Sequence, residues 1–143
     1  MTDRLRFFRR LDADPRWHRS RAALRPADAE RFPGDGLTDA IARALCERGA
    51  TCPKELLEAT EVFALARKVV RRPVVADLCC GHGLAGVLFA ALERSGERVV
   101  LVDRERPPCA DAILEAVGAV APWAPPKVEW RAAPHQRVGQ EPG

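Results

Sequence analysis

Several residue types and patterns that mark particular protein classes are scarce in this chain. It has no tyrosine and one methionine, and no two of its cysteines have the C-x-x-C spacing of a structural zinc site. The longest apolar run, residues 84–92, is far shorter than the roughly 20 residues that a transmembrane helix requires. No apolar stretch follows the arginine-rich N-terminus, which argues against a secretory signal. We therefore expect neither a metal centre nor a membrane protein.

The cysteines show no disulfide framework. There are five, an odd number, at irregular spacings. Cys79 and Cys80 are neighbours at the end of an expected strand, where adjacent side chains point to opposite faces and do not bridge each other. We interpret all five as reduced thiols, and hence expect a cytoplasmic protein.

What the chain does contain is enough apolar material for one folded domain. Of its 143 residues, 47% are hydrophobic, and the net charge is only +3. The positive charge is uneven, because residues 1–31 hold nine arginines and five acidic residues. Such an excess favours RNA or an acidic partner surface. It is more typical of a solvated arm in an arginine-rich chain, which we favour, because a local basic excess alone carries little specificity.

The first half of the sequence has patterns typical of helices. Residues 1–36 are broken by prolines, and we expect an irregular basic arm with one or two short helices. The spacing of apolar residues predicts an amphipathic helix over 37–48, followed by a second helix from Pro53 to about Arg71. Pro73 prevents this second helix from continuing.

The pattern then alternates between strands and helices. Apolar segments predict strands at 73–80, 98–103 and 127–131, and helices at 84–95 and 109–117. This alternation predicts an α/β fold, with a three-stranded parallel sheet, flanking helices and an N-terminal helical extension. We assign residues 37–131 to the domain and expect a disordered tail over 132–143.

A glycine-rich loop links the first expected strand to the next helix. Gly81 and Gly83 allow a tight turn and a close approach of a ligand to the backbone. Asp103 ends the next strand, 20 residues after Gly83, where an acid accepts hydrogen bonds from ribose hydroxyls. Together with Gly86 the glycines satisfy G-x-G-x-x-G, the dinucleotide pattern, so an NAD-type Rossmann fragment is one alternative.

Asp77 favours a different cofactor. It lies inside the end of the first expected strand, four residues before Gly81, where a carboxylate without a partner is costly to bury but one that faces a cationic ligand is not. S-adenosylmethionine carries an ammonium and a sulfonium and no phosphate. An acid at this strand end therefore suits it better than it suits a dinucleotide.

The string from Asp77 to Gly83, DLCCGHG, resembles the first motif of class I S-adenosylmethionine-dependent methyltransferases. Cys79 stands where that motif has its first glycine, Gly81 and Gly83 match the other two, and Asp103 matches the acid of the second motif. The resemblance covers roughly residues 53–131. It is nearest to methyltransferase-domain proteins with a lead-in helix and a D-x-C-x-G-x-G loop, some of which act on tRNA.

This resemblance implies a Rossmann-like fold, S-adenosylmethionine as the cofactor, and an RNA or a small molecule as the methyl acceptor. The residues that it places beside the cofactor lie in the loop and at the two strand ends: Asp77, Cys79, Gly81, His82, Gly83, Asp103 and Arg104. Asp77 would lie near the methionine ammonium, and Asp103 would bind the ribose. No catalytic residue is assigned.

The expected strands make up only part of the fold that the resemblance implies. Class I methyltransferases usually have a seven-stranded sheet in which the first strand is central, whereas three strands are expected here. The first strand would then be an exposed apolar edge, which invites association. We expect a C-terminally truncated methyltransferase, incomplete as an enzyme, or a chain that completes its sheet with a partner or with itself. A non-catalytic cofactor-binding or interaction module is the remaining alternative.

Overall fold

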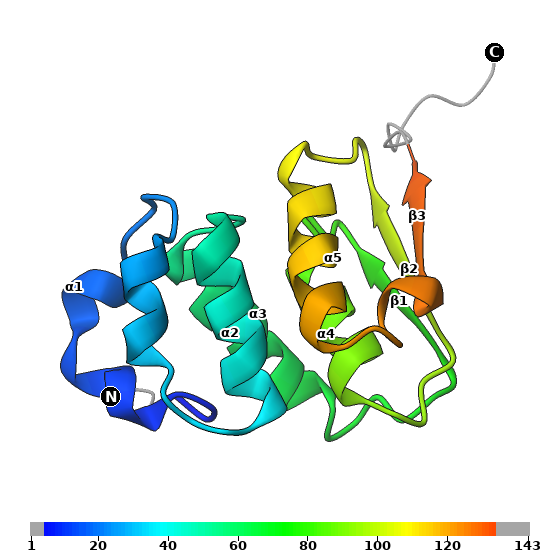
Figure 1. Cartoon of the computed structure of the whole chain (residues 1–143). Coiled ribbons are helices and arrows are strands. Elements are labelled where there is room, and N and C mark those ends of the chain that lie inside the picture. The colour runs from blue at the N-terminus through cyan, green and yellow to red at the C-terminus, as the bar shows by residue number, and fades with distance from the viewer. Residues whose placement is uncertain (1–4, 134–143) are drawn as a thin grey trace, which may run out of the picture.

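The computed structural model describes residues 5–133. In this part of the chain a helical layer built from the N-terminal half lies beside an α/β layer built from the C-terminal half (Figure 1). Of the expected tail, residues 134–143 lie outside the described residues.

The segment expected as an irregular arm contains three short helical pieces and is packed onto the rest of the molecule. The pieces are η1 (Arg9–Ala13), α1 (Pro15–His18) and η2 (Pro26–Arg31). Phe8 and Phe32 are buried, with ring centroids 4.9 Å apart in an edge-to-face contact. These apolar side chains belong to the hydrophobic core, so the segment is packed against the rest of the molecule.

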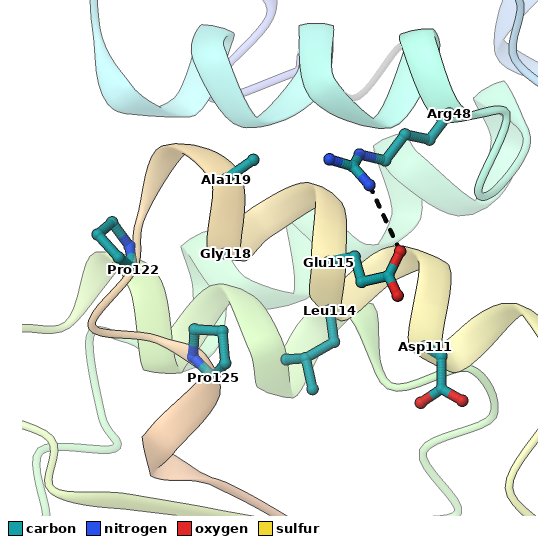
Figure 2. A pocket seen from close by; sticks show the side chains of 8 residues that line it. All are labelled: Arg48, Asp111, Leu114, Glu115, Gly118, Ala119, Pro122 and Pro125. Carbon is teal, nitrogen blue, oxygen red and sulfur yellow. Dashed lines mark hydrogen bonds and ion pairs between the residues drawn. The ribbon is translucent and has the colours of Figure 1, made fainter.

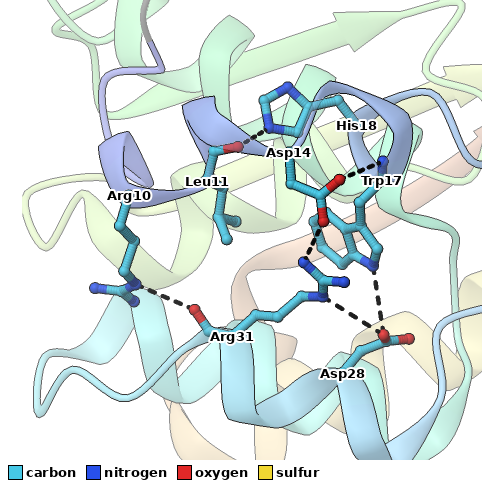
Figure 3. A network of polar contacts seen from close by, with 7 residues as sticks. All are labelled: Arg10, Leu11, Asp14, Trp17, His18, Asp28 and Arg31. Atoms are coloured by element: carbon cyan, nitrogen blue, oxygen red, sulfur yellow. Dashed lines mark hydrogen bonds and ion pairs between the residues drawn. The ribbon is translucent and has the colours of Figure 1, made fainter.

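A polar network fastens this segment (Figure 3). Asp28 is buried, and its carboxylate accepts hydrogen bonds from the backbone N–H of Arg25 at 2.9 Å and from Trp17 Nε1 at 3.3 Å. Arg31 forms an ion pair of 2.8 Å with Asp14, and its guanidinium lies 4.7 Å above the Trp17 ring. Part of the arginine excess therefore serves internal contacts.

Two longer helices complete the helical layer. α2 (Leu37–Arg48) has the predicted bounds and ends at Gly49, whose φ of 59° is the left-handed conformation that glycine favours. α3 (Pro53–Ala66) begins as predicted but ends before Arg71. The chain leaves the helix in a series of turns, which is consistent with the bias that Pro73 imposes on the residue before it.

The α/β layer contains the predicted three-stranded parallel sheet, and its strands lie in the order β1-β2-β3. Its strands are β1 (Val74–Leu78), β2 (Arg98–Asp103) and β3 (Val128–Ala132), and a short 3-10 turn, η3 (Pro125–Lys127), precedes the last. The crossover helices α4 (Leu84–Leu92) and α5 (Cys109–Val120) lie on one face of the sheet (Figure 1). α3 packs on α4 and α2 packs on α5, so the three layers are sheet, crossover helices and helical layer.

The open face of the sheet is the one opposite these helices. In the register Ala76 pairs with Val100, and Val100 pairs with Glu129. Because paired residues point to the same face, these three side chains lie on the same face of the sheet.

The helices within residues 5–133 are all too short or too polar to span a membrane.

Candidate functional site

The loop between β1 and α4 has an alternating backbone conformation. Cys79, Gly81 and Gly83 all have positive φ values, of 58°, 58° and 83°. For a residue with a side chain the left-handed conformation costs roughly 1–2 kcal/mol, and within residues 5–133 only Cys79 is a non-glycine that adopts it. Cys79 therefore takes the backbone conformation of a glycine, at the position where the resemblance expects one.

The two glycines of this loop serve different purposes. A Cβ atom on Gly81 would meet nothing within 4 Å, so the space beside its backbone is open to a ligand. A Cβ on Gly83 would lie 2.7 Å from Leu101 Cδ1 and 2.9 Å from Trp130 Cζ2. Gly83 therefore lets the loop pack directly on side chains of β2 and β3, with Trp130 as a packing residue.

Asp103 connects the end of β2 to the loop. Its Oδ2 accepts a hydrogen bond from the backbone N–H of Gly81 at 2.7 Å, and its Oδ1 accepts one from the N–H of Arg104 at 2.6 Å. The Arg104 side chain is exposed beside it.

Asp77 faces α4. Its carboxylate accepts a hydrogen bond from the backbone N–H of Gly86, in the first turn of α4. Burial raises the pKa of Asp77, the Gly86 bond acts in the opposite direction, and the charge of Asp103 raises it further. A carboxylate therefore lies where the N-terminus of α4 favours negative charge.

His82 turns away from the open side of the loop. Its Nε2 lies 3.1 Å from Thr51 Oγ1 and 3.7 Å from Glu55 Oε2, and its Nδ1 accepts the backbone N–H of Leu84 at 3.3 Å. Burial lowers the pKa of His82, and the charge of Glu55 partly opposes this. The imidazole therefore anchors the loop to the residues that begin α3.

Two thiols, that of Cys80 in the loop and that of Cys46 on α2, are poor nucleophiles. Burial raises the pKa of Cys80 to about 11 and that of Cys46 to about 12, so both are protonated at neutral pH. All five cysteines are free. Within residues 5–133 no group of three or more His, Cys, Asp or Glu side chains is placed to hold a metal ion.

A large surface groove lies elsewhere. It has a volume of about 600 Å³, lies between α2 and α5, and contains an ion pair of 3.4 Å between Arg48 and Glu115 (Figure 2). None of the residues predicted for the cofactor lines this groove. The candidate site is instead the β1–α4 loop together with Asp103, at the carboxyl ends of β1 and β2.

The structure brings most of the predicted residues together. Asp103 bonds directly to the loop at Gly81, and Asp77 lies close enough for the charge of Asp103 to raise its pKa. The side chain of His82 points toward the helical layer instead. Thr51 and Glu55 were missed, because nothing in the sequence links them to a histidine about 30 positions away.

The described chain is thus an α/β protein with a three-stranded parallel sheet flanked by helices and a glycine-rich loop at its carboxyl edge. Comparisons with protein-family models, with curated proteins and with solved structures find no match.

Proposed function

We propose that this chain is a class I methyltransferase-like protein whose Rossmann-like half-domain binds S-adenosylmethionine at the β1–α4 loop. One observation carries the proposal. Cys79, Gly81 and Gly83 adopt left-handed conformations at alternate positions, and the acid at the end of β2 is hydrogen-bonded to the middle one. This places an approachable backbone beside a carboxylate, as a nucleoside ligand requires.

The position of Asp77 supports a cationic cofactor over a dinucleotide. In dinucleotide-binding folds the N-terminus of the first crossover helix binds the pyrophosphate. Here the carboxylate of Asp77 already accepts the N–H of Gly86 in that turn. A phosphate would meet two carboxylates, those of Asp77 and Asp103, whereas the ammonium and sulfonium of S-adenosylmethionine would be attracted to them.

Each of these residues has a binding role in the proposal. Asp103 accepts the ribose hydroxyls, Gly81 lets the cofactor lie against the backbone, and Arg104 lies beside the adenosine. The bound cofactor supplies a methyl group activated by its sulfonium. Transfer requires little from a protein beyond alignment of acceptor, methyl and sulfur, and we assign no catalytic residue.

For the methyl acceptor we propose RNA, with a small molecule as the alternative. RNA is supported by four exposed arginines of the N-terminal segment that make no ion pair within the described residues: Arg9, Arg16, Arg19 and Arg21. Other arginines of this segment are engaged internally, since Arg6 pairs with Glu61 at 2.8 Å.

Isothermal titration calorimetry with S-adenosylhomocysteine and with NAD tests the cofactor assignment. We expect S-adenosylhomocysteine to bind and Asp103→Asn to weaken its binding by at least about tenfold, because one lost charge-assisted hydrogen bond costs roughly 1.5–3 kcal/mol. Glu115→Gln, the matched control on α5, should bind as the unmodified chain does.

Two outcomes would contradict this proposal. Binding of NAD alone would replace it with the dinucleotide alternative. If the folded chain binds neither compound, the cofactor assignment is wrong, and a non-catalytic interaction module is the alternative that remains.

A further inference from the structure

The exposed large apolar side chains of the described residues gather along one edge of the molecule. They belong to α3, to the turn after it and to β1: Val62, Leu65, Val69, Val74 and Leu78, each more than half exposed. β1 is also an end strand of the sheet, so its outer edge has no strand partner among residues 5–133. An unpaired strand with apolar flanks is a place where another strand can add.

The opposite end of the sheet differs in charge. On β3, Glu129 bonds to Arg98 Nε at 2.9 Å and to Arg131 Nε at 2.8 Å. Charged side chains on an end strand oppose the addition of another strand. Strand addition is therefore favoured at β1.

A strand added to β1 would have to be apolar on both faces. On the helix side it would lie next to the exposed face of α3, where a cavity of about 160 Å³ is lined mostly by apolar residues such as Val62 and Phe89, with Asp77 as the one acidic residue of its lining. On the other side it would extend the open face of the sheet, beside Val74 and Leu78.

β1 itself has this character except at Asp77, whose carboxylate already accepts the Gly86 N–H of its own α4. Val74, Ala76 and Leu78 point to the open face, and the alternate residues point to the helices.

The charged residues at the two ends of β1 favour one direction of pairing with a partner strand. Arg71 and Arg72 precede β1 and make no ion pair within the described residues, whereas acids lie at its other end, Asp77 on β1 and Asp103 on β2.

An antiparallel partner strand brings these opposite charges together, and a parallel one places like charges side by side. We propose that a second copy of this chain docks on the β1 edge, with the two β1 strands paired antiparallel about a twofold axis. The axis is perpendicular to the sheet, so both copies keep their helices on the same side. The exposed residues of α3, Val62 and Leu65, then pack against those of the second copy.

Centring the pair on Ala76 overlaps the whole of β1. Val74 of one copy lies opposite Leu78 of the other, and Arg72 lies near the acidic end of the other sheet. Because the contact is the same on both sides it closes after two copies. The proposal stands on the sheet edge alone and does not depend on the cofactor.

Sedimentation velocity on the full chain, from about 1 µM to about 100 µM, tests the dimer in the range typical of modest interfaces. We expect a concentration-dependent dimer. Leu65→Lys and Val74→Lys should each weaken it by at least about tenfold, because a lysine in an apolar contact must lose its hydration. Ala119→Lys adds the same charge at an exposed position of α5 away from β1, and should dimerise as the unmodified chain does.

Three results would overturn the proposal: a monomer throughout this range, a dimer that both lysine variants leave intact, or assembly that continues beyond two copies. Circular dichroism identifies any variant that has lost its fold.

A cross-link supplies a test that needs no destabilising change. Ala76→Cys, made in a Cys79→Ser background, would lie opposite itself with a Cα separation of about 4.5–5.5 Å, which is within disulfide range. Mild oxidation should then give a covalent dimer, whereas Ala119→Cys in the same background should stay largely monomeric. A non-covalent dimer in which Ala76→Cys does not cross-link would overturn the antiparallel pairing.

Discussion

His82 is held at both ring nitrogens, and this makes the glycine loop sensitive to protonation. Nδ1 accepts the N–H of Leu84 and therefore carries no proton, which places the hydrogen of the neutral ring on Nε2, beside Thr51. Protonation of Nδ1 would remove that bond and put a positive charge at the N-terminus of α4, where cations are unfavourable. The neutral form of His82 is thus the one that stabilises the fold.

We expect the free energy of unfolding to fall as the pH drops below about 6.5, the ordinary pKa of histidine. Burial lowers the pKa of His82 in the folded state, so the unfolded chain takes up a proton first and is favoured. The stabilising contribution of neutral His82 is fully present above the ordinary pKa of histidine. It decreases progressively as the pH falls from there to the lower pKa that His82 has in the folded state. Urea denaturation between about pH 5 and pH 8 measures this.

His82→Gln should remove this part of the pH dependence. His18→Gln is the control, because it leaves His82 in place. If the pH profile of the His82 variant matches that of the unmodified chain, the contacts of this ring do not govern the titration.

At the scale of elements, the contact of α4 with the sheet depends on Gly86. A Cβ at this position would lie 2.3 Å from Leu101 Cδ2 and 3.3 Å from Val99 Cγ1. The missing side chain lets the helix lie directly on β2, and it also lets the Gly86 N–H approach the carboxylate of Asp77. One glycine therefore serves both the packing and the site.

Gly86→Ala should destabilise the protein by about 1–3 kcal/mol, because the overlap with Leu101 outweighs the gain of roughly 1 kcal/mol in helix propensity. Gly36→Ala is the matched control, since a Cβ there meets nothing within 4 Å. It should change the free energy of unfolding by about 1 kcal/mol or less. An equal effect of the two alanines in urea denaturation would mean that the helix–sheet contact has room to relax.

At the scale of the whole molecule, the N-terminal segment is part of the hydrophobic core. Phe8 packs on Phe32, Phe7 stacks on Phe63 of α3 at 5.9 Å, and Phe63 contacts Phe89 of α4 at 4.9 Å. This chain of rings links the segment through α3 to the crossover helix beneath the sheet. The helical and α/β layers should therefore unfold together.

Phe8→Ala should cost about 3–5 kcal/mol, the usual range for removing a buried phenylalanine. Its urea transition should stay single and should coincide when followed by circular dichroism and by tryptophan fluorescence. Arg9→Ala, an exposed neighbour, should change stability by less than about 0.5 kcal/mol. Separate transitions, or a loss below about 1 kcal/mol for Phe8→Ala, would show that the segment is an appendage.

The sequence by itself determined the α/β class and the positions of most elements, because these depend on local spacing. The 37–48 helix and the 98–103 strand have their predicted bounds, since apolar periodicity and a following glycine or turn act within a few residues. The positive φ values of Gly81 and Gly83 follow from the same local chemistry, since glycine is the residue that a tight turn accommodates most easily.

Only the tertiary structure decided where the less regular parts lie. The N-terminal segment has no regular apolar spacing, so its burial depends on surfaces that α2 and α3 present from elsewhere in the chain. The direction of His82 toward Thr51 likewise arises when distant segments meet, and the hydrogen bond from Gly86 to Asp77 depends on how α4 packs against the sheet. Asp77 and the loop could be found from the sequence, but their contacts could not, because contacts between distant segments leave no local pattern in the chain.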